Sequence, residues 1–225
     1  MHRGWIIAGM LAAAAAGAVF LSVRACAAAP EPASEWQSGV HYTMYARPQA
    51  TSVAPGKVEV AEVFWYGCGH CYALDPALEA WKTKKPAFIE FVRIPVMWGP
   101  VHAQHARLYY TMLALGRGDL HPKIFESIHE GGNLLAAQDE AQARELHLAF
   151  FREHGVTRAQ FDAAYDSAGV AEEVERAQIL TGRYEIAGVP QFVVAGTYTT
   201  SLSLVGSEPK LFTLLQDLAR REKGR

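Results

Sequence analysis

The chain has 225 residues, of which 50% are hydrophobic, and a formal net charge of −2 at pH 7. This length is enough to bury a substantial core, so we expect one domain, or one domain with an insertion. The nearly balanced charge gives no indication of a nucleic-acid partner, and we expect none.

The first 29 residues have the pattern of an export signal. His2 and Arg3 precede an uncharged, mostly apolar run over residues 5–23, and the alanines at 27–29 are small enough for cleavage. The run is long for a signal peptide, so an uncleaved membrane anchor is the open alternative. We therefore expect an exported protein whose residues 1–29 are a signal peptide or a membrane anchor.

Cys26 lies in this segment and leaves a lipid anchor open, although Arg24 makes the residues before it a poor match to a lipidation signal. Residues 30–38, with prolines and small or polar side chains, are predicted to be a linker. An exported mature chain would keep two cysteines, Cys68 and Cys71, in a compartment where disulfides persist.

These two cysteines form the motif Cys68-Gly69-His70-Cys71 at a predicted junction between a strand and a helix. Residues 58–66 are rich in β-branched and aromatic side chains, which predicts a buried strand. Residues 72–85 repeat apolar side chains at three- and four-residue spacing, which predicts a helix. The unpaired N–H groups and the positive dipole at the helix start would stabilise a thiolate on Cys68, and His70 would add to this.

A stabilised thiolate makes Cys68 a good leaving group and favours the reduced pair, so the Cys68–Cys71 disulfide is expected to oxidise other thiols. Cys71, one turn deeper, is expected to be buried and to act as the resolving thiol. A disulfide that closes so short a loop would reduce the entropy of the unfolded chain only slightly and so stabilise the fold very little. A role in thiol–disulfide exchange is therefore the better explanation for the pair. A metal site would need two further ligands, and we expect neither a metal nor a cofactor.

The rest of the chain predicts an α/β domain interrupted by helices. Residues 40–45 alternate as a short edge strand does, and residues 88–94 are the next long strand, parallel to residues 58–66 across the intervening helix. Between residues 101 and 168 there are helical patterns and no good strand, which predicts an inserted helical subdomain.

Strands return near the C-terminus, after a helix predicted over residues 170–183. Residues 191–195 are predicted to be a strand, and residues 197–205 a second strand that pairs back on it in a hairpin. Ser207 is placed to cap a last helix whose leucines form one buried stripe.

This order of elements resembles the thioredoxin fold of the DsbA type, the exported bacterial thiol:disulfide interchange proteins. The resemblance covers about residues 36–223 and is carried by the lead-in from Glu62 to Gly67, the Cys-Gly-His-Cys motif and the loop Gly188-Val189-Pro190. It implies an α/β, thioredoxin-like fold with the inserted helical subdomain at residues 99–169.

The same resemblance assigns residues 39–98 and 170–225 to the thioredoxin-like domain. It implies a cis peptide bond before Pro190, in a loop beside the cysteines, and a backbone at Val189 that binds an extended substrate segment as an added strand. Gly69-His70 departs from the Pro-His of the best-known members and is similar to the pair in protein disulfide isomerases, so the strength of the oxidant is left unranked.

The resemblance also implies partners, namely reduced, unfolded substrate proteins and a membrane quinone-linked protein that reoxidises the cysteines. It implies a periplasmic location, and we expect a monomer. Two rival functions stay open: a disulfide reductase or isomerase of the same fold, and a non-catalytic, chaperone-like binding module.

Three side chains beyond the cysteines are candidate site residues. Glu62 lies on the predicted buried strand, where an unpaired carboxylate is costly and its pKa should rise, so it is a candidate proton relay for Cys71. A structural hydrogen-bond partner or an edge position facing water is the alternative. His70 changes the electric field at the thiolate. Trp98 is a candidate for an apolar substrate surface, although such aromatic residues also suit a core.

The loop that holds Trp98 also holds Met97, and both are expected near the surface. His102 and His105 share a helical face, but without a carboxylate or a third ligand nearby we do not expect them to bind a metal. The remaining histidines are expected at the surface.

Overall fold

The computed structural model describes residues 1–2 and 35–224 of the chain. The predicted signal or anchor beyond its first two residues, with Cys26, and most of the predicted linker lie outside these described residues. Within residues 35–224, none of the helices combines the length with the apolarity that crossing a membrane requires.

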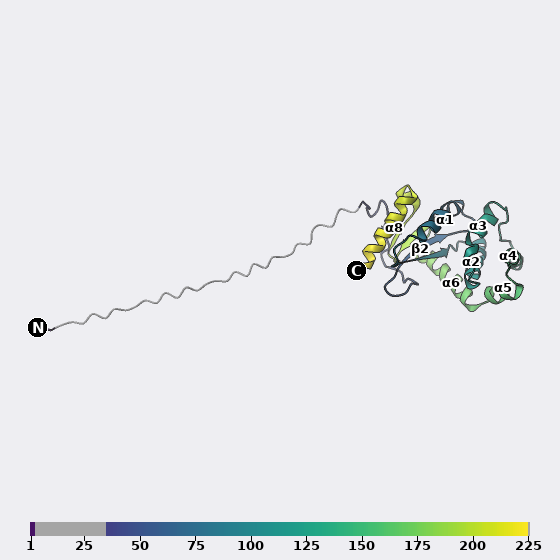
Figure 1. The fold of residues 1–225 in the computed structure, drawn as a ribbon, viewed down its shortest axis with the longest axis horizontal. Helices are drawn as coiled ribbons and strands as arrows, with labels where there is room; N and C mark the ends of the chain where they lie inside the picture. The colour runs from purple at the N-terminus through teal and green to yellow at the C-terminus, as the bar shows by residue number, and fades with distance from the viewer. Residues whose placement is uncertain (3–34, 225) are drawn as a thin grey trace. The chain divides into compact units, whose positions relative to one another are not determined.

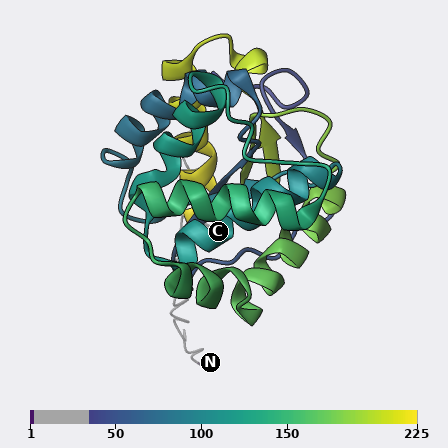
Figure 2. The same ribbon diagram turned by 90° about the vertical axis from the view of Figure 1, so that its right-hand side faces the viewer.

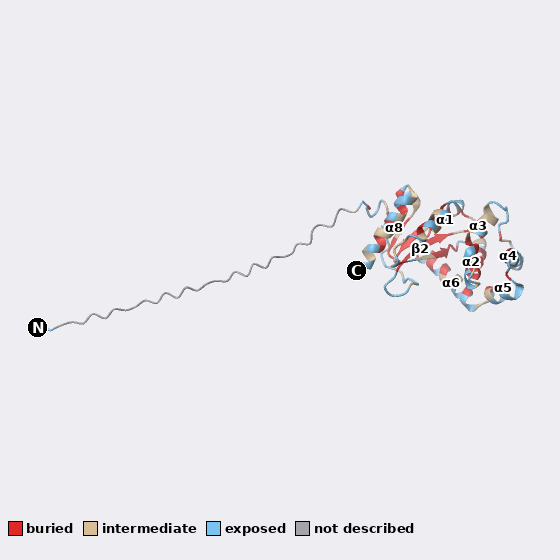
Figure 3. Cartoon of the chain, viewed as in Figure 1, coloured by how far each residue is buried: buried red, intermediate tan, exposed pale blue. Residues whose placement is uncertain are grey.

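Five strands of the described part of the chain form one mixed sheet in the order β1-β5-β4-β2-β3. Their bounds are Thr43–Met44 for β1, Val58–Phe64 for β2, Ile89–Pro95 for β3, Gln191–Val194 for β4 and Tyr198–Thr200 for β5. Strand β2 pairs in parallel with β3 and antiparallel with β4, and every residue of β2 is buried (Figure 3). The predicted buried strand and its parallel neighbour are confirmed.

Helices cover both faces of the sheet. α1 (Gly69–Lys82) and α8 (Glu208–Lys223) bury their leucines against one face, and α2 (Pro100–Ala114) and α6 (Ala168–Arg183) pack against the other. The other described helices are α3 (His121–His129), which follows a 3-10 turn at Gly118–Leu120, α4 (Glu140–Glu153), α5 (Arg158–Tyr165) and the short α7 (Leu202–Val205). α4 and α5 lie on the side of α2 and α6 that faces away from α8 (Figures 1 and 2).

Local signals explain where several helices begin and end. In α5, the Thr157 hydroxyl accepts from the Gln160 N–H while the Gln160 side chain accepts from the Thr157 N–H, which makes a capping box. The side chains of Asp139 and Ser167 cap α4 and α6. After α4, Gly155 has a φ of +83°, a left-handed conformation that glycine adopts without strain.

The C-terminal hairpin differs from its prediction. Only Tyr198–Thr200 is a strand, and the last part of the predicted strand is helix α7. Alternating serine and leucine favour a strand there, but Gly206, with a φ of +80°, lets its N–H reach the Leu202 carbonyl at 2.8 Å and closes a helical turn. Ser207 precedes α8 as predicted, although its side chain makes no capping hydrogen bond.

The inserted helices share a core with the sheet. Buried side chains of Val63 and Ile94 in the sheet and of Leu108, Phe125 and Leu180 in the helices belong to one continuous cluster. Helices α2 to α6 lie between β3 and β4 in the chain, so the predicted insertion of helices into an α/β domain is confirmed. The predicted domain boundaries stay predictions.

Candidate active site

Cys68 and Cys71 lie at the start of α1, where the predicted junction places them. Cys68 is the N-cap residue of the helix, and its sulfur accepts a hydrogen bond from the Cys71 N–H at 3.2 Å. The helix begins at Gly69, earlier than the apolar pattern predicts, because this cap and not an apolar side chain holds its first turn. Cys68 is 9% exposed and Cys71 is 0% exposed, so a partner meets Cys68 first.

The two thiols have opposite acidities. The hydrogen bond between their side chains lowers the pKa of Cys68 to about 6 against the cost of burial, and the backbone N–H groups of Cys71 and His70 and the charge of the exposed His70 add to this. Burial raises the pKa of Cys71 far above its usual value, and the charge of Glu62 raises it further. At neutral pH the reduced pair therefore carries a thiolate on Cys68 and a thiol on Cys71.

The loop of Val189 and Pro190 lies against Cys68. The peptide bond between Val189 and Pro190 is cis, as the resemblance implies, and the Cys68 sulfur lies 3.5 Å from the Val189 carbonyl oxygen. Strand β4 begins at the next residue, Gln191, so the sheet holds this loop in place. Beside the loop lies a cavity of about 730 Å³, whose wall includes His70, Pro190 and residues of α7. An extended chain segment at this cavity would lie next to the reactive sulfur.

Trp98 presents an exposed aromatic ring on the loop after β3. The residue is 44% exposed, its Nε1 donates to the Ile186 carbonyl at 3.0 Å, and its ring meets His102 edge-on at 5.5 Å between centroids. Its predicted surface position is confirmed. The same prediction is wrong for Met97, which is buried and whose N–H donates to the Thr181 hydroxyl at 3.1 Å.

Glu62 is buried on β2, and it is paired. Its side chain accepts from Nε of Arg93 at 2.8 Å, and Arg93 is the residue directly opposite it on β3. Burial raises the pKa of Glu62, although the charge of Arg93 opposes the shift. The predicted rise is confirmed, whereas the alternative of an edge position facing water is wrong, because β2 lies between β3 and β4 and Glu62 has a paired residue on each of them.

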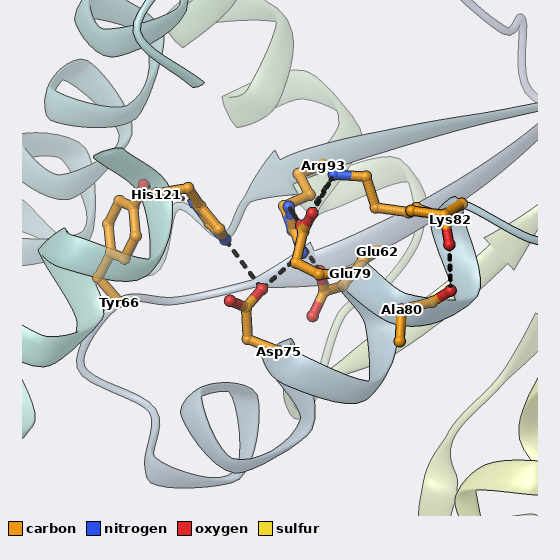
Figure 4. A network of polar contacts seen from close by, with 9 residues as sticks. Glu62, Tyr66, Asp75, Glu79, Ala80, Lys82, Arg93 and His121 are labelled. Atoms are coloured by element: carbon orange, nitrogen blue, oxygen red, sulfur yellow. Dashed lines mark hydrogen bonds and ion pairs between the residues drawn. The ribbon is translucent and has the colours of Figure 1, made fainter. Parts of the chain in front are cut away.

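Arg93 is the centre of a set of buried polar contacts next to the active-site helix (Figure 4). Its Nη2 binds Asp75 at 2.6 Å and its Nη1 binds Glu79 at 2.8 Å, both on α1. Asp75 also lies 3.3 Å from Nε2 of His121, whose Nδ1 is 2.8 Å from the Tyr66 hydroxyl. We refer to Glu62, Tyr66, Asp75, Glu79, Arg93 and His121 as the buried polar cluster.

Sequence reasoning missed the histidines of this region. The prediction that they lie at the surface is wrong for His121 and His147, which are both buried. His121, Phe125 and His129 follow one another at four-residue spacing, which places them on one face of α3. That face meets Tyr66, whose backbone carbonyl lies 2.8 Å from Nε2 of His129. The four-residue spacing of two histidines around a phenylalanine was the signal in the sequence for a buried polar face.

Comparisons with known proteins agree with this geometry. A family model described as the DSBA-like thioredoxin domain matches residues 59–219. The thiol:disulfide interchange protein DsbA of Pseudomonas aeruginosa is 33% identical over 192 residues, which cover 85% of this chain and 88% of that protein. The protein of the same name from Burkholderia cepacia is 38% identical over 185 residues, with 82% and 84% covered. The crystal structure of Pseudomonas aeruginosa DsbA matches with a TM-score of 0.77 at 33% identity and covers 85% of this chain and 97% of that chain.

Proposed function

The chain belongs to the family of DSBA-like thioredoxin domains, and from that premise we propose that it is an exported enzyme that introduces disulfide bonds into reduced, unfolded proteins. Its fold is thioredoxin-like, and it is a protein thiol:disulfide oxidoreductase. The observation that carries the proposal is the opposed acidity of its two thiols. A thiolate favoured at Cys68 stabilises the reduced enzyme, so the Cys68–Cys71 disulfide is an oxidant of other thiols.

The proposed reaction begins with the enzyme disulfide. A substrate thiolate attacks Sγ of Cys68, a bond forms between the two sulfurs, the Cys68–Cys71 bond breaks, and its electron pair goes to Cys71, which takes up a proton. A second substrate thiolate then attacks the substrate sulfur of this mixed disulfide and releases Cys68 as a thiolate. The substrate has lost two electrons and gained a disulfide, and the enzyme holds one thiolate and one thiol.

In this scheme Glu62 supplies the proton that Cys71 takes up. Burial raises the pKa of Glu62, and the charge of an ionised Glu62 raises the pKa of Cys71. In the proposed step, Glu62 gives a proton to the sulfur of Cys71 when that sulfur is released as an anion. Exposed His70 acts differently, because its charge supports the thiolate on Cys68.

Substrate binding in this proposal uses backbone more than side chains. The polar groups of Val189, beside the cis bond to Pro190, would pair with an extended substrate segment, which suits an enzyme with many unfolded substrates. The cavity of about 730 Å³ next to this loop would take substrate side chains, and the exposed ring of Trp98 would add apolar contact.

Turnover requires that the reduced cysteines are oxidised again. We assign this step to a membrane quinone-linked protein that approaches Cys68 from the side used by substrates. The proposed location is the periplasm, where disulfides persist, and the proposed working form is a monomer. Residues 1–29 would serve export as a cleaved signal or as an anchor.

Oxidative refolding of a reduced model protein by the purified chain tests the proposal. The wild-type chain should restore activity to the model protein, whereas Cys68→Ser and Cys71→Ser should not, because neither variant can hold the disulfide. Glu62→Gln should slow the reaction by a factor on the order of 10², the lower end of what general acid catalysis contributes. Full function of Cys68→Ser would favour the chaperone-like binding module, and faster reduction than oxidation of substrate would favour the reductase or isomerase.

A further inference from the structure

The buried part of the buried polar cluster contains two carboxyl groups and one guanidinium group. Glu62 and Asp75 are both buried, and the single guanidinium of Arg93, also buried, contacts both carboxyl groups. Glu79 contacts Arg93 as well, but it is half-buried and Lys82 binds it at 2.8 Å. With Arg93 charged, one interior carboxylate is left without a full counter-charge, so one proton shared between Glu62 and Asp75 lowers the cost of burial.

His121 distinguishes these two carboxyl groups. The Tyr66 hydroxyl, 2.8 Å from Nδ1, can donate to that nitrogen, which puts the ring proton on Nε2. Nε2 is buried without an aligned hydrogen bond and lies 3.3 Å from Oδ1 of Asp75. The ring is held in this orientation by aromatic contacts with Phe64, Tyr66, Tyr109 and Phe125. The positive end of the Nε2–H bond therefore favours a carboxylate at Asp75.

We propose that His121 is a positioning residue that keeps Asp75 ionised against Arg93 and so directs the exchangeable proton of the cluster to Glu62. This inference deepens the proposed function and rests on it, because Glu62 is the group that passes its proton to Cys71 in the oxidation of a substrate. His121 touches neither the substrate nor the reacting sulfurs, and its effect reaches them through two carboxyl groups.

The acidities of the cluster agree with this assignment. Burial acts to raise the pKa of Asp75, but His121 and Arg93 outweigh it and lower the pKa overall. Burial prevails at Glu62, whose pKa is raised because Arg93 offsets the cost only in part. Burial also lowers the pKa of His121 to about 4, so at neutral pH the ring acts through its N–H dipole and not through a charge.

Charged and titratable groups face His121 and the cluster from every neighbouring element. They are Glu62 on β2, Tyr66 in the loop after it, Asp75, Glu79 and Lys82 on α1, Arg93 on β3, Tyr109 on α2, and Glu172, Glu173 and Arg176 on α6. A cavity of about 750 Å³ has both Arg93 and His121 in its wall. Water in this cavity would reach the cluster at Arg93 and His121.

The test follows the two carboxyl groups directly. Carbon-13 NMR of the carboxyl groups in the reduced full chain, recorded during a pH titration, reports the titration midpoints of Glu62 and Asp75. The variants Glu62→Gln and Asp75→Asn identify which signal belongs to which residue. His121→Asn keeps an amide near the position of Nδ1, for Tyr66, but loses the donor to Asp75. His121→Gln reaches the position of Nε2 and keeps that donor. His129→Asn, on the same face of α3, is the matched control because His129 contacts a backbone carbonyl.

In His121→Asn we expect the Asp75 midpoint to rise and the Glu62 midpoint to fall, each by about one pH unit, because the N–H dipole that favours the Asp75 carboxylate is lost. His121→Gln and His129→Asn should leave both midpoints close to those of the wild-type chain. Unmoved midpoints in His121→Asn, or equal shifts in His121→Asn and His121→Gln, overturn the proposal. These midpoints do not depend on disulfide exchange, so inactivity of the wild-type chain in refolding would refute the proposed function alone.

Discussion

The contacts of one sulfur atom decide the chemistry of Cys68. The thiol of Cys71 and the N–H groups at the start of α1 stabilise its anion, and its pKa is about 6 where an ordinary cysteine has about 8.5. These contacts exist only in the folded chain. The preference for a thiolate is therefore a contribution to the stability of the reduced protein as well as to its reactivity.

We expect the reduced chain to become more stable as the pH rises from about 5 to about 8, below the range in which Cys71 of the unfolded chain ionises. Because the pKa of about 6 in the folded chain lies below that of the unfolded chain, this stabilisation is complete above the unfolded value and is lost as the pH falls through 6. With solvent screening, Cys68 should contribute about 2 kcal/mol of this gain, as the difference between the wild-type chain and Cys68→Ser, because the buried His105 and His147 add their own gain in both chains. Urea unfolding at the two pH values measures it, and the same gain in Cys68→Ser would contradict the assigned acidity.

At the scale of elements, the turn between β2 and α1 depends on a close contact. A Cβ at Gly67 would lie 2.4 Å from the Trp65 ring, whereas a Cβ at Gly69 would meet open space. Gly67→Ala should therefore destabilise the chain by about 1–3 kcal/mol and slow exchange at Cys68. Gly69→Ala is the control and should stabilise by up to about 1 kcal/mol, because alanine suits the first helical turn better. Equal losses in urea unfolding of both variants would refute the role of the ring.

The loop between α3 and α4 is held by two buried histidines. Nε2 of His105 and Nε2 of His147 each lie 2.8 Å from a backbone carbonyl oxygen, that of Leu134 and that of Leu135. Leu135 has a φ of +51°, a conformation that residues other than glycine adopt at a cost. Burial lowers the pKa of both histidines to about 4, so both are neutral at pH 7.

Acid should loosen this loop. Because the pKa of His147 in the folded chain lies below the unfolded value of about 6.5, its stabilisation is complete above that value and is lost as the pH falls towards 4, by up to about 3 kcal/mol. His147→Gln keeps a donor for Leu135 and cannot be protonated. It should lose less stability than the wild-type chain between about pH 7 and about pH 4.5 in urea unfolding. An equally steep loss in His147→Gln would count against this account.

Elements were predictable where their signals are local. The strand β2 and the junction between strand and helix at Cys68 are specified by residues within a few positions of each other, whereas the first residue of α1 is set by the Cys68 cap. α7 was not, because its turn closes only when Gly206 takes a left-handed φ, which alternation of serine and leucine does not reveal. The cysteines of the candidate site followed from the motif, and the cis bond before Pro190 only from the resemblance.

The buried polar cluster was beyond sequence reasoning for a different reason. Arg93 faces Glu62 because β2 and β3 pair in one particular parallel register, and neither strand alone shows which arginine meets which carboxylate. His121 reaches Asp75 only because the inserted helix α3 packs against α1. From the sequence, one can predict that a buried acid needs a partner. One cannot predict which side chain on another element that partner is.

For the whole molecule, the shared core of sheet and inserted helices predicts cooperative unfolding. Phe125 of α3 is buried, and its ring lies 4.9 Å from that of Tyr66 and 6.1 Å from that of Phe64 on β2. Phe125→Ala should therefore destabilise β2 and α8 together with α3, by about 3–5 kcal/mol. Leu113→Ala, on the exposed side of α2, is the control and should change the free energy of unfolding by less than about 1 kcal/mol.

Native-state hydrogen exchange measures this coupling, because it reports the opening free energy of each element separately. In Phe125→Ala the slowest amides of β2, α3 and α8 should all exchange faster by the same free energy. If α3 alone exchanges faster while β2 and α8 keep their protection, the inserted helices open as a separate unit. The shared core would then stabilise the helices and the sheet without coupling their unfolding. The buried polar cluster would also lose the contact of His121 whenever α3 opened.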